Sequence, residues 1–147
     1  MSDDVLHHDR NRATEAELLA HLRAADAGFV PALSARVDLY AYAAKLHARA
    51  ERFEAWAGPA LVGLVAAYCN AGSAFVSSVS VLPPWQGRGL ARQLMLHCLD
   101  FARAQGLSGM ALEVDARAAA ALALYRRLGF SERARRGTTL DLRLELA

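Results

Sequence analysis

The sequence predicts an α/β domain of the α+β type, in which a mixed, mainly antiparallel sheet has helices on both faces. Two amphipathic helices come first, and three strands joined by short turns come after them. A strand–helix–strand–helix order and a terminal hairpin complete the pattern. Short turns join antiparallel neighbours, whereas a strand–helix–strand unit within one sheet is a right-handed parallel crossover. The 147 residues, 54% of them hydrophobic, suit one domain with its own core over residues 1–147.

Two helices are expected before the first strand. Thr14 or Asn11 can cap the first helix, which reaches about Ala27. Asp38 can cap the second helix, over residues 39–50, whose apolar residues recur every three to four positions. Each helix therefore has one apolar side to place against a sheet.

The rest of the chain alternates between strand and helix patterns. Gly58-Pro59 and the stretch 70–72 are turn signals that predict an antiparallel meander of three strands. Because ligands of such sheets bind beyond the carboxyl ends of parallel strands, we expect the site there. We expect strands over residues 52–57, 61–69, 74–82 and 109–115, helices over 89–105 and 117–128, and a hairpin of 130–135 and 138–146.

Composition argues against several classes of function. The formal net charge of +2 is too small to indicate nucleic-acid binding. No apolar run approaches the ~20 residues that span a membrane, and the first twelve residues lack the apolar core of a signal peptide. Cys69 and Cys98 form no C-x-x-C pair, and the histidines have no metal-ligand spacing. We expect a cytoplasmic protein with reduced thiols, no metal, and no nucleic-acid or membrane partner.

The loop after the third strand carries the most specific signal. A helix N-terminus offers unpaired N–H groups and about half a positive charge, which suits a phosphate. Gly87 and Gly89 let the backbone approach an anion closely, and Arg88 and Arg92 add charge at the rim. The loop therefore predicts a pyrophosphate site at the start of the next helix.

Three kinds of phosphate loop can be compared with this stretch. The Walker pattern G-x-x-x-x-G-K-[ST] is absent. The dinucleotide pattern G-x-G-x-x-G fails at its third glycine, where this chain has Arg92. The pattern Q-x-x-G-x-A is met by Gln86, Gly89 and Ala91.

With this loop the chain resembles the GNAT superfamily of N-acetyltransferases. That family's loop reads [QR]-x-x-G-x-[GA] after a strand ending V-x-P, and Val81 and Pro83 match the strand end. A second signature, A-x-x-L-Y-x-x-x-G-F, is matched downstream by Ala121, Leu124, Tyr125, Gly129 and Phe130. The two signatures come in the family's order with one strand between them, and the likeness covers about residues 60–130.

The resemblance implies a co-substrate and a reaction. Acetyl-coenzyme A (acetyl-CoA) would give its acetyl group to a primary amine, either a small molecule or a peptide N-terminus, by direct attack. A backbone N–H near Val81 would stabilise the oxyanion, and Tyr125 would act as the general acid toward the leaving thiolate. The resemblance assigns co-substrate binding to Val79, Val81, Gln86, Gly87, Arg88, Gly89, Leu90 and Ala91.

Glu113 is the candidate general base. It lies in a strand expected to be buried on both faces, where a charge needs a partner or a task. Leu112-Glu113-Val114 also resembles the L-E-V strand of GNAT enzymes that acetylate ribosomal-protein N-termini. Those enzymes usually have Asn seven residues before the tyrosine, where this chain has Ala118. A structural ion pair is the alternative role for Glu113.

Other interpretations stay open at this point. The glycines could form only a tight turn, and Tyr125 could be a core aromatic residue. Tyr40, Tyr42 and Tyr68 could line an acceptor pocket or pack in the core. A non-catalytic acyl-CoA-binding or sensing domain would keep the loop without turnover, and a nucleotide-binding module is a more distant alternative. The acceptor is not identified, and both a monomer and a homodimer are compatible with the sequence.

Overall fold

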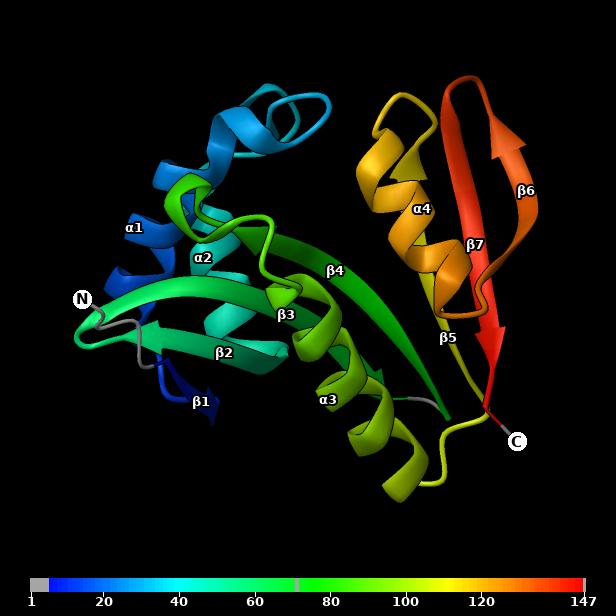
Figure 1. Cartoon of the computed structure of the whole chain (residues 1–147), viewed down its shortest axis with the longest axis horizontal. Helices are drawn as coiled ribbons and strands as arrows, with labels where there is room; N and C mark the ends of the chain where they lie inside the picture. The colour runs from blue at the N-terminus through cyan, green and yellow to red at the C-terminus, as the bar shows by residue number, and fades with distance from the viewer. Residues whose placement is uncertain (1–5, 71, 147) are drawn as a thin grey trace.

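The computed structural model of the chain describes residues 6–70 and 72–146, and its strands form one seven-stranded sheet (Figure 1). The strand order is β1-β2-β3-β4-β5-β7-β6. All neighbours pair antiparallel except β4 and β5, which pair parallel as predicted. The strands are β1 (His7–Arg10), β2 (Glu51–Ala57), β3 (Ala60–Asn70), β4 (Ser73–Val81), β5 (Gly109–Asp115), β6 (Ser131–Arg136) and β7 (Thr139–Glu145).

The helices cover both faces of the sheet, which confirms the predicted fold class. On one face α1 and α2 enclose a core around Trp56 and Leu64, and on the other α3 and α4 enclose a larger core around Leu94 and Met110. The α-helices are α1 (Glu15–Ala25), α2 (Leu39–Arg49), α3 (Leu90–Ala104) and α4 (Ala119–Arg127). Short 3-10 turns are η1 (Asp26–Gly28), η2 (Leu33–Ala35) and η3 (Pro83–Trp85).

The predicted helices and strands agree with the observed bounds to within two residues, but strand β1 was not predicted. Its four residues are all exposed, so the sequence has no buried alternation there. Hydrogen bonds just after β1 hold the segment in place. Fully buried Glu54 accepts hydrogen bonds from the amides of Arg12 (3.0 Å) and Ala13 (3.1 Å), and Arg52 lies 3.4 Å from its carboxylate. This buried pair anchors the chain before α1.

The two predicted N-caps are present. Thr14, rather than Asn11, caps α1 in a reciprocal capping box with Glu17, and the Asp38 side chain caps α2. A capping interaction of this type stabilises a helix by about 1 kcal/mol. The connection between these helices is closed by Asp26, whose carboxylate accepts from the amide and the hydroxyl of Ser34, both at 2.7 Å. These bonds hold the pKa of Asp26 below its usual value.

Strand β4 contains a β-bulge that the sequence did not predict. Ala67 pairs with Val76 and Ala66 pairs with Ser78, so Ser77 has no partner residue on β3. The hydroxyl of Tyr42, on α2, donates to the carbonyl of Ser77 at 3.1 Å. A bulge bends a strand and sharpens its local twist. The bulge lies directly after the last residue of β4 that pairs with β5.

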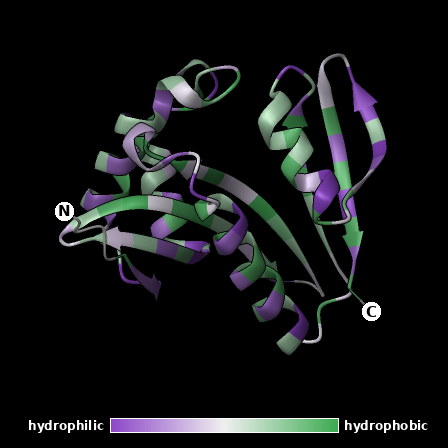
Figure 2. Cartoon of the chain, in the orientation of Figure 1, coloured by the Kyte–Doolittle hydropathy of each residue, from purple (hydrophilic) through white to green (hydrophobic). Residues whose placement is uncertain are grey.

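Strand β6 forms the edge of the sheet, and all six of its residues are exposed. Its charged residues appear as a hydrophilic strand in Figure 2. Arg133, Arg135 and Arg136 form ion pairs with Glu145, Glu132 and Asp141 respectively. Charged edge strands resist pairing with other chains. Among the described residues, no helix is long and apolar enough to cross a bilayer, and no group of three or more His, Cys, Asp or Glu side chains is arranged to hold a metal ion.

Candidate active site

The centre of the sheet opens where β4 and β5 diverge. The two strands pair at only three positions, from Ala74 with Met110 to Val76 with Leu112, and then separate (Figure 1). The amide of Leu82 donates to Val62 of β3 at 2.9 Å. Because backbone groups alternate along a strand, the N–H groups of residues 79 and 81 point to the opposite, open edge. The sheet is therefore splayed beyond these three pairs, with one edge of β4 left open.

Two adjoining cavities lie along this opening. The larger cavity, about 510 Å³, lies between the chain segment 28–37, β4 and β5. The smaller cavity, about 230 Å³, lies between residues 79–81 of β4, Gln86, Ala91 and α4. Gly28, Phe29, Val79, Ala121 and Tyr125 line both cavities. A ligand in one cavity would therefore reach a ligand in the other beside Tyr125.

The predicted anion loop ends at the smaller cavity. Gly87 and Gly89 both have positive φ, 79° and 76°, and Gly89 is the N-cap of α3. Among the described residues, the amides of Gly87, Gly89 and the first helical turn, residues 90–92, have no hydrogen-bond acceptor. Arg88 stacks over the ring of Trp85 at 4.9 Å. Unpaired amides, a helix dipole and no acidic residue in the first turn together make a cradle for an anion.

Gln86 joins this loop to β4. Its side-chain Nε2 donates to the carbonyl of Val81 at 2.9 Å. The carbonyl of Val81 is therefore occupied, whereas its amide faces the open edge of the strand. An extended ligand could therefore bond to the backbone N–H of Val81 but not to its carbonyl. The backbone of Val79 lies on the same open edge.

Tyr125 lies at the junction of the cavities because of how α4 ends. Gly129 adopts a φ of 104°, which lets the chain turn so that the amide of Phe130 donates to the carbonyl of Tyr125 at 3.0 Å. The two rings then pack edge to face with centroids 6.0 Å apart. Tyr125 is only 6% exposed, and burial raises its pKa to about 12. The phenol is therefore protonated at neutral pH and can donate a proton.

The sequence-based expectation that Glu113 is buried is wrong. Its side chain is 49% exposed and lines the larger cavity. Residues 110, 112 and 114 of β5 face the core under α3 and α4 and are buried, but the opposite face is uncovered because α1 and α2 stop short of β5. Arg136 donates to the Glu113 carboxylate at 3.1 Å. Glu113 thus has both an ion-pair partner and access to the cavity.

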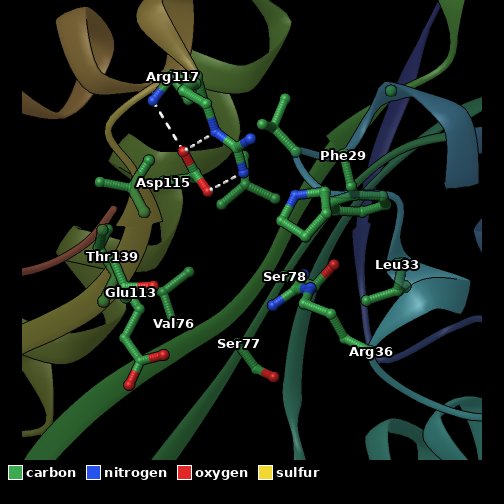
Figure 3. A pocket seen from close by; sticks show the side chains of 18 of the residues that line it. Phe29, Leu33, Arg36, Val76, Ser77, Ser78, Glu113, Asp115, Arg117 and Thr139 are labelled. Atoms are coloured by element: carbon green, nitrogen blue, oxygen red, sulfur yellow. Dashed lines mark hydrogen bonds and ion pairs between the residues drawn. The ribbon is translucent and has the colours of Figure 1, made fainter. Parts of the chain in front are cut away.

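The other charges of the larger cavity are also paired or balanced. Asp115 accepts two bonds from the Arg117 side chain, at 2.9 and 2.8 Å, which hold its pKa well below the usual range. In Figure 3, Glu113, Asp115 and Arg117 lie on one side of the cavity, and Phe29, Leu33 and Arg36 lie on the other. Two carboxylates and two guanidinium groups line it, so its formal charge is balanced.

Part of the exposed lining of the larger cavity is apolar. Four large hydrophobic residues are exposed among the described parts of the chain, and three of them, Val30, Val37 and Phe75, line this cavity. Of the three tyrosines considered from the sequence, Tyr42 lines the cavity, while Tyr40 is exposed to solvent outside it and Tyr68 does not line it.

Comparison with known proteins places this arrangement in a family. The profile of the acetyltransferase (GNAT) family matches residues 16–130. The chain belongs to the GNAT family. The two signatures that predicted the family from the sequence lie within this match, on either side of the open edge of β4.

Several curated GNAT relatives align with part of the chain. The ribosomal protein bS18-alanine N-acetyltransferase of Salmonella typhimurium (strain LT2) is 46% identical over 55 residues, which is 37% of this chain and 37% of that enzyme. Streptothricin acetyltransferase of Streptomyces lavendulae is 41% identical over 56 residues, 38% of this chain and 30% of that enzyme. In the matched part, the chain thus spans 37% and 30% of the length of these two relatives.

Solved GNAT structures share the whole fold. The ribosomal-protein-S18-alanine N-acetyltransferase of Escherichia coli superposes with a TM-score of 0.80 at 22% identity, covering 97% of this chain and 95% of that one. The paiA N-acetyltransferase of Thermoplasma acidophilum, solved with coenzyme A, gives a TM-score of 0.74 at 11% identity, covering 95% and 99%. At such identities the likeness shows the fold.

The predicted co-substrate residues overlap the smaller cavity in part. Val79, Val81, Gln86 and Ala91 line it, residues 87–89 belong to the loop before α3, and Leu90 is buried in the core. The larger cavity also contains groups that were not predicted, among them Ser78, whose buried hydroxyl has no hydrogen-bond partner in the described structure. The sequence contains one indication of the bulge, because Ser77-Ser78 interrupts the alternation of apolar and polar residues along β4. Ala118 also lines the larger cavity.

Proposed function

We propose that the protein is an acetyl-CoA-dependent N-acetyltransferase that joins its two substrates beside Tyr125. The observation that carries this proposal is the pair of adjoining cavities, one ending at the anion loop and the other at Glu113, with Tyr125 lining both. Membership of the GNAT family and relatives named as acetyltransferases support it.

The co-substrate site is inferred from the backbone geometry of the smaller cavity. Residues 86–91 would hold the pyrophosphate of acetyl-CoA through unpaired amides and the dipole of α3. The open edge of β4 at Val79 and Val81 would pair with the extended pantetheine arm, as an added strand pairs with a sheet edge. The acetyl thioester would then lie at the junction of the cavities.

Catalysis would combine positioning with proton transfers at the amine and at the leaving thiolate. The free amine attacks the thioester carbon, a β4 amide stabilises the oxyanion, and the C–S bond breaks as Tyr125 protonates the thiolate. The second proton lost by the attacking nitrogen would restore the Tyr125 hydroxyl. Holding two reactants together is worth roughly 7–11 kcal/mol, more than the about 4–5 kcal/mol needed to deprotonate an alkyl ammonium at neutral pH. Glu113, on the wall of the larger cavity, would accept the ammonium proton directly or through water.

The larger cavity suits a monoamine attached to an apolar group, such as a peptide N-terminus. A polyamine would need several carboxylates, but Glu113 and Asp115 each already hold an arginine. The exposed side chains of Val30, Val37 and Phe75 offer apolar contacts around the entrance instead. The relatives that are named as ribosomal-protein alanine N-acetyltransferases make an alanine-initiated peptide the first acceptor to test.

Calorimetric titration with acetyl-CoA, with ATP and NADH as controls, tests the co-substrate. Selective binding of acetyl-CoA is expected, whereas equal or tighter binding of ATP or NADH would overturn the proposal. Release of free thiol is then measured with an alanine-initiated peptide whose next residues are apolar, an amino sugar and a polyamine. Turnover of the peptide is expected. Binding of acetyl-CoA without turnover of any amine would instead indicate a non-catalytic acyl-CoA-binding domain.

A further inference from the structure

A buried histidine of α1 contacts strand β4, to which the proposed function assigns the pantetheine arm. His21, on α1, is 2% exposed and lies between the helix and the sheet. Its Nδ1 is 2.9 Å from the carbonyl oxygen of Leu61, and its Nε2 is 2.7 Å from the hydroxyl of Ser80 on β4. The catalytic and binding roles proposed for the other residues use neither of these two side chains.

The two hydrogen bonds determine which atoms carry protons. A carbonyl oxygen only accepts, so Nδ1 of His21 must carry a hydrogen and donate to Leu61. Burial lowers the pKa of His21, which keeps the ring neutral at neutral pH. Nε2 then has a lone pair and no hydrogen, so the Ser80 hydroxyl must donate to it. The oxygen of Ser80 is left with lone pairs only, and any further hydrogen bond that it makes must be one that it accepts.

Ser80 lies on the wall of the smaller cavity and not of the larger one. Its neighbours there are Val79, Val81 and Gln86, which the proposed function assigns to acetyl-CoA. Ala25, one helical turn after His21, lines the same cavity. The serine is therefore placed to meet the co-substrate rather than the amine.

We propose that His21 fixes the Ser80 hydroxyl as a hydrogen-bond acceptor for an N–H group of the pantetheine arm of acetyl-CoA. This inference rests on the proposed function, because it needs acetyl-CoA in the smaller cavity. Ser80 is then a binding residue, and His21 is a positioning residue that acts through it. The main-chain edge of β4 alone would accept any extended ligand, so this side chain adds a preference for a donor at one point along the arm.

Ser80→Ala tests the contact, with Ser73→Ala as the matched control. Ser73 is on the same strand and lines neither cavity. Affinities are measured for acetyl-CoA and for 3′-phosphoadenosine 5′-diphosphate, the nucleotide half that lacks the pantetheine arm. Loss of one neutral hydrogen bond predicts an about three- to tenfold weaker acetyl-CoA affinity for Ser80→Ala. Nucleotide affinity and the KM for the amine should be unchanged, and Ser73→Ala should resemble the wild type.

Equal weakening of both ligands, or no weakening, would overturn the inference while leaving acetyl-CoA binding by the wild type intact. If the wild type itself binds no acetyl-CoA, the proposed function fails first, so the two failures are distinguishable. A purely structural contact between α1 and β4 would lower thermal stability in Ser80→Ala without separating the two ligands.

The role of His21 is tested in two further ways. His21→Leu should reproduce the selective loss of acetyl-CoA affinity, and His21→Gln, which keeps a donor and an acceptor, should restore part of it. Nitrogen-15 NMR of the wild type should show His21 with hydrogen on Nδ1 and none on Nε2 at neutral pH. The opposite tautomer would overturn the assignment even if every variant of His21 or Ser80 failed to fold.

Discussion

The two cavities that meet at Tyr125 are built in different ways. The smaller cavity is bounded by residues 79–81 of β4, by α4, and by Gln86 and Ala91 at the two ends of the loop that contains Gly87 and Gly89. The larger cavity is bounded by charged and aromatic side chains from segments far apart in the sequence. A backbone cradle needs glycines at fixed spacing, which leaves a readable motif. A side-chain pocket needs only suitable neighbours after folding, so its residues need no fixed spacing in the sequence.

Removing the Tyr125 hydroxyl should have the largest effect, because it acts where the two cavities join. Tyr125→Phe should lower kcat by about 10²- to 10⁴-fold, the usual contribution of a general acid. Acetyl-CoA affinity should change little, since the hydroxyl acts in the leaving-group step. Because burial raises the pKa of Tyr125 to about 12, its ionisation should cause no fall in rate at neutral pH. The exposed residue Tyr40, changed to Phe, is the control; a Tyr125→Phe variant at full rate would remove the general-acid role.

The second-largest effect is expected from a substitution in the larger cavity. Glu113→Gln should lower kcat by about 10²-fold if this carboxylate takes the amine proton, the low end of the range for general bases. Glu132→Gln is the matched control, because Glu132 also pairs with an arginine on the hairpin but lines neither cavity. Equal rates for the two variants would assign Glu113 a structural role with Arg136.

A change confined to the anion loop should act on binding instead. Gly89→Glu should weaken acetyl-CoA affinity by about tenfold or more, because it puts a negative charge at the N-terminus of α3. Gly106→Glu is the matched control, since Gly106 follows the other end of the same helix with φ of 73° against 76° for Gly89. A Cβ at either glycine would meet open space. Both variants should lose about 1–2 kcal/mol of stability from backbone strain, but titration should show weaker binding only for Gly89→Glu.

The smallest expected effect is on stability at acidic pH. Burial lowers the pKa of His21, so the folded state resists protonation. The contribution of His21 is fully present above its unfolded pKa of about 6.5 and falls as the pH drops below that value. The melting temperature should fall less between pH 7.5 and pH 5.5 in His21→Gln than in the wild type. His7, an exposed histidine on β1, is changed to Gln as the surface control.

The helices and strands that could be predicted are those with a regular hydrophobic pattern or a helix N-cap residue. Trp56 and Leu64 on one face and Leu94 on the other follow strand and helix patterns, and Thr14 and Asp38 cap helices where expected. These features depend on neighbours a few residues away, so a single sequence contains them.

Features that depend on distant contacts were not predicted. Strand β1 is polar throughout, and the residues directly after it are held by hydrogen bonds to Glu54, which lies more than forty residues away. The exposure of Glu113 follows from where α1 and α2 end over the sheet, which no local pattern at Glu113 records. The contact of His21 with Ser80 joins residues 59 positions apart. Contacts between residues so far apart in the sequence can be identified only in the folded structure.

The open edge of β4 has a consequence for the survival of the protein in a cell. A strand without a neighbour at the centre of a sheet leaves the two halves of the molecule joined by few main-chain bonds. Under the proposed function, bound acetyl-CoA takes the place of the missing neighbour, and at one hundred times its Kd it would add about 2.7 kcal/mol to the free energy of unfolding. Resistance to heat and proteolysis would then rise with the concentration of free acetyl-CoA.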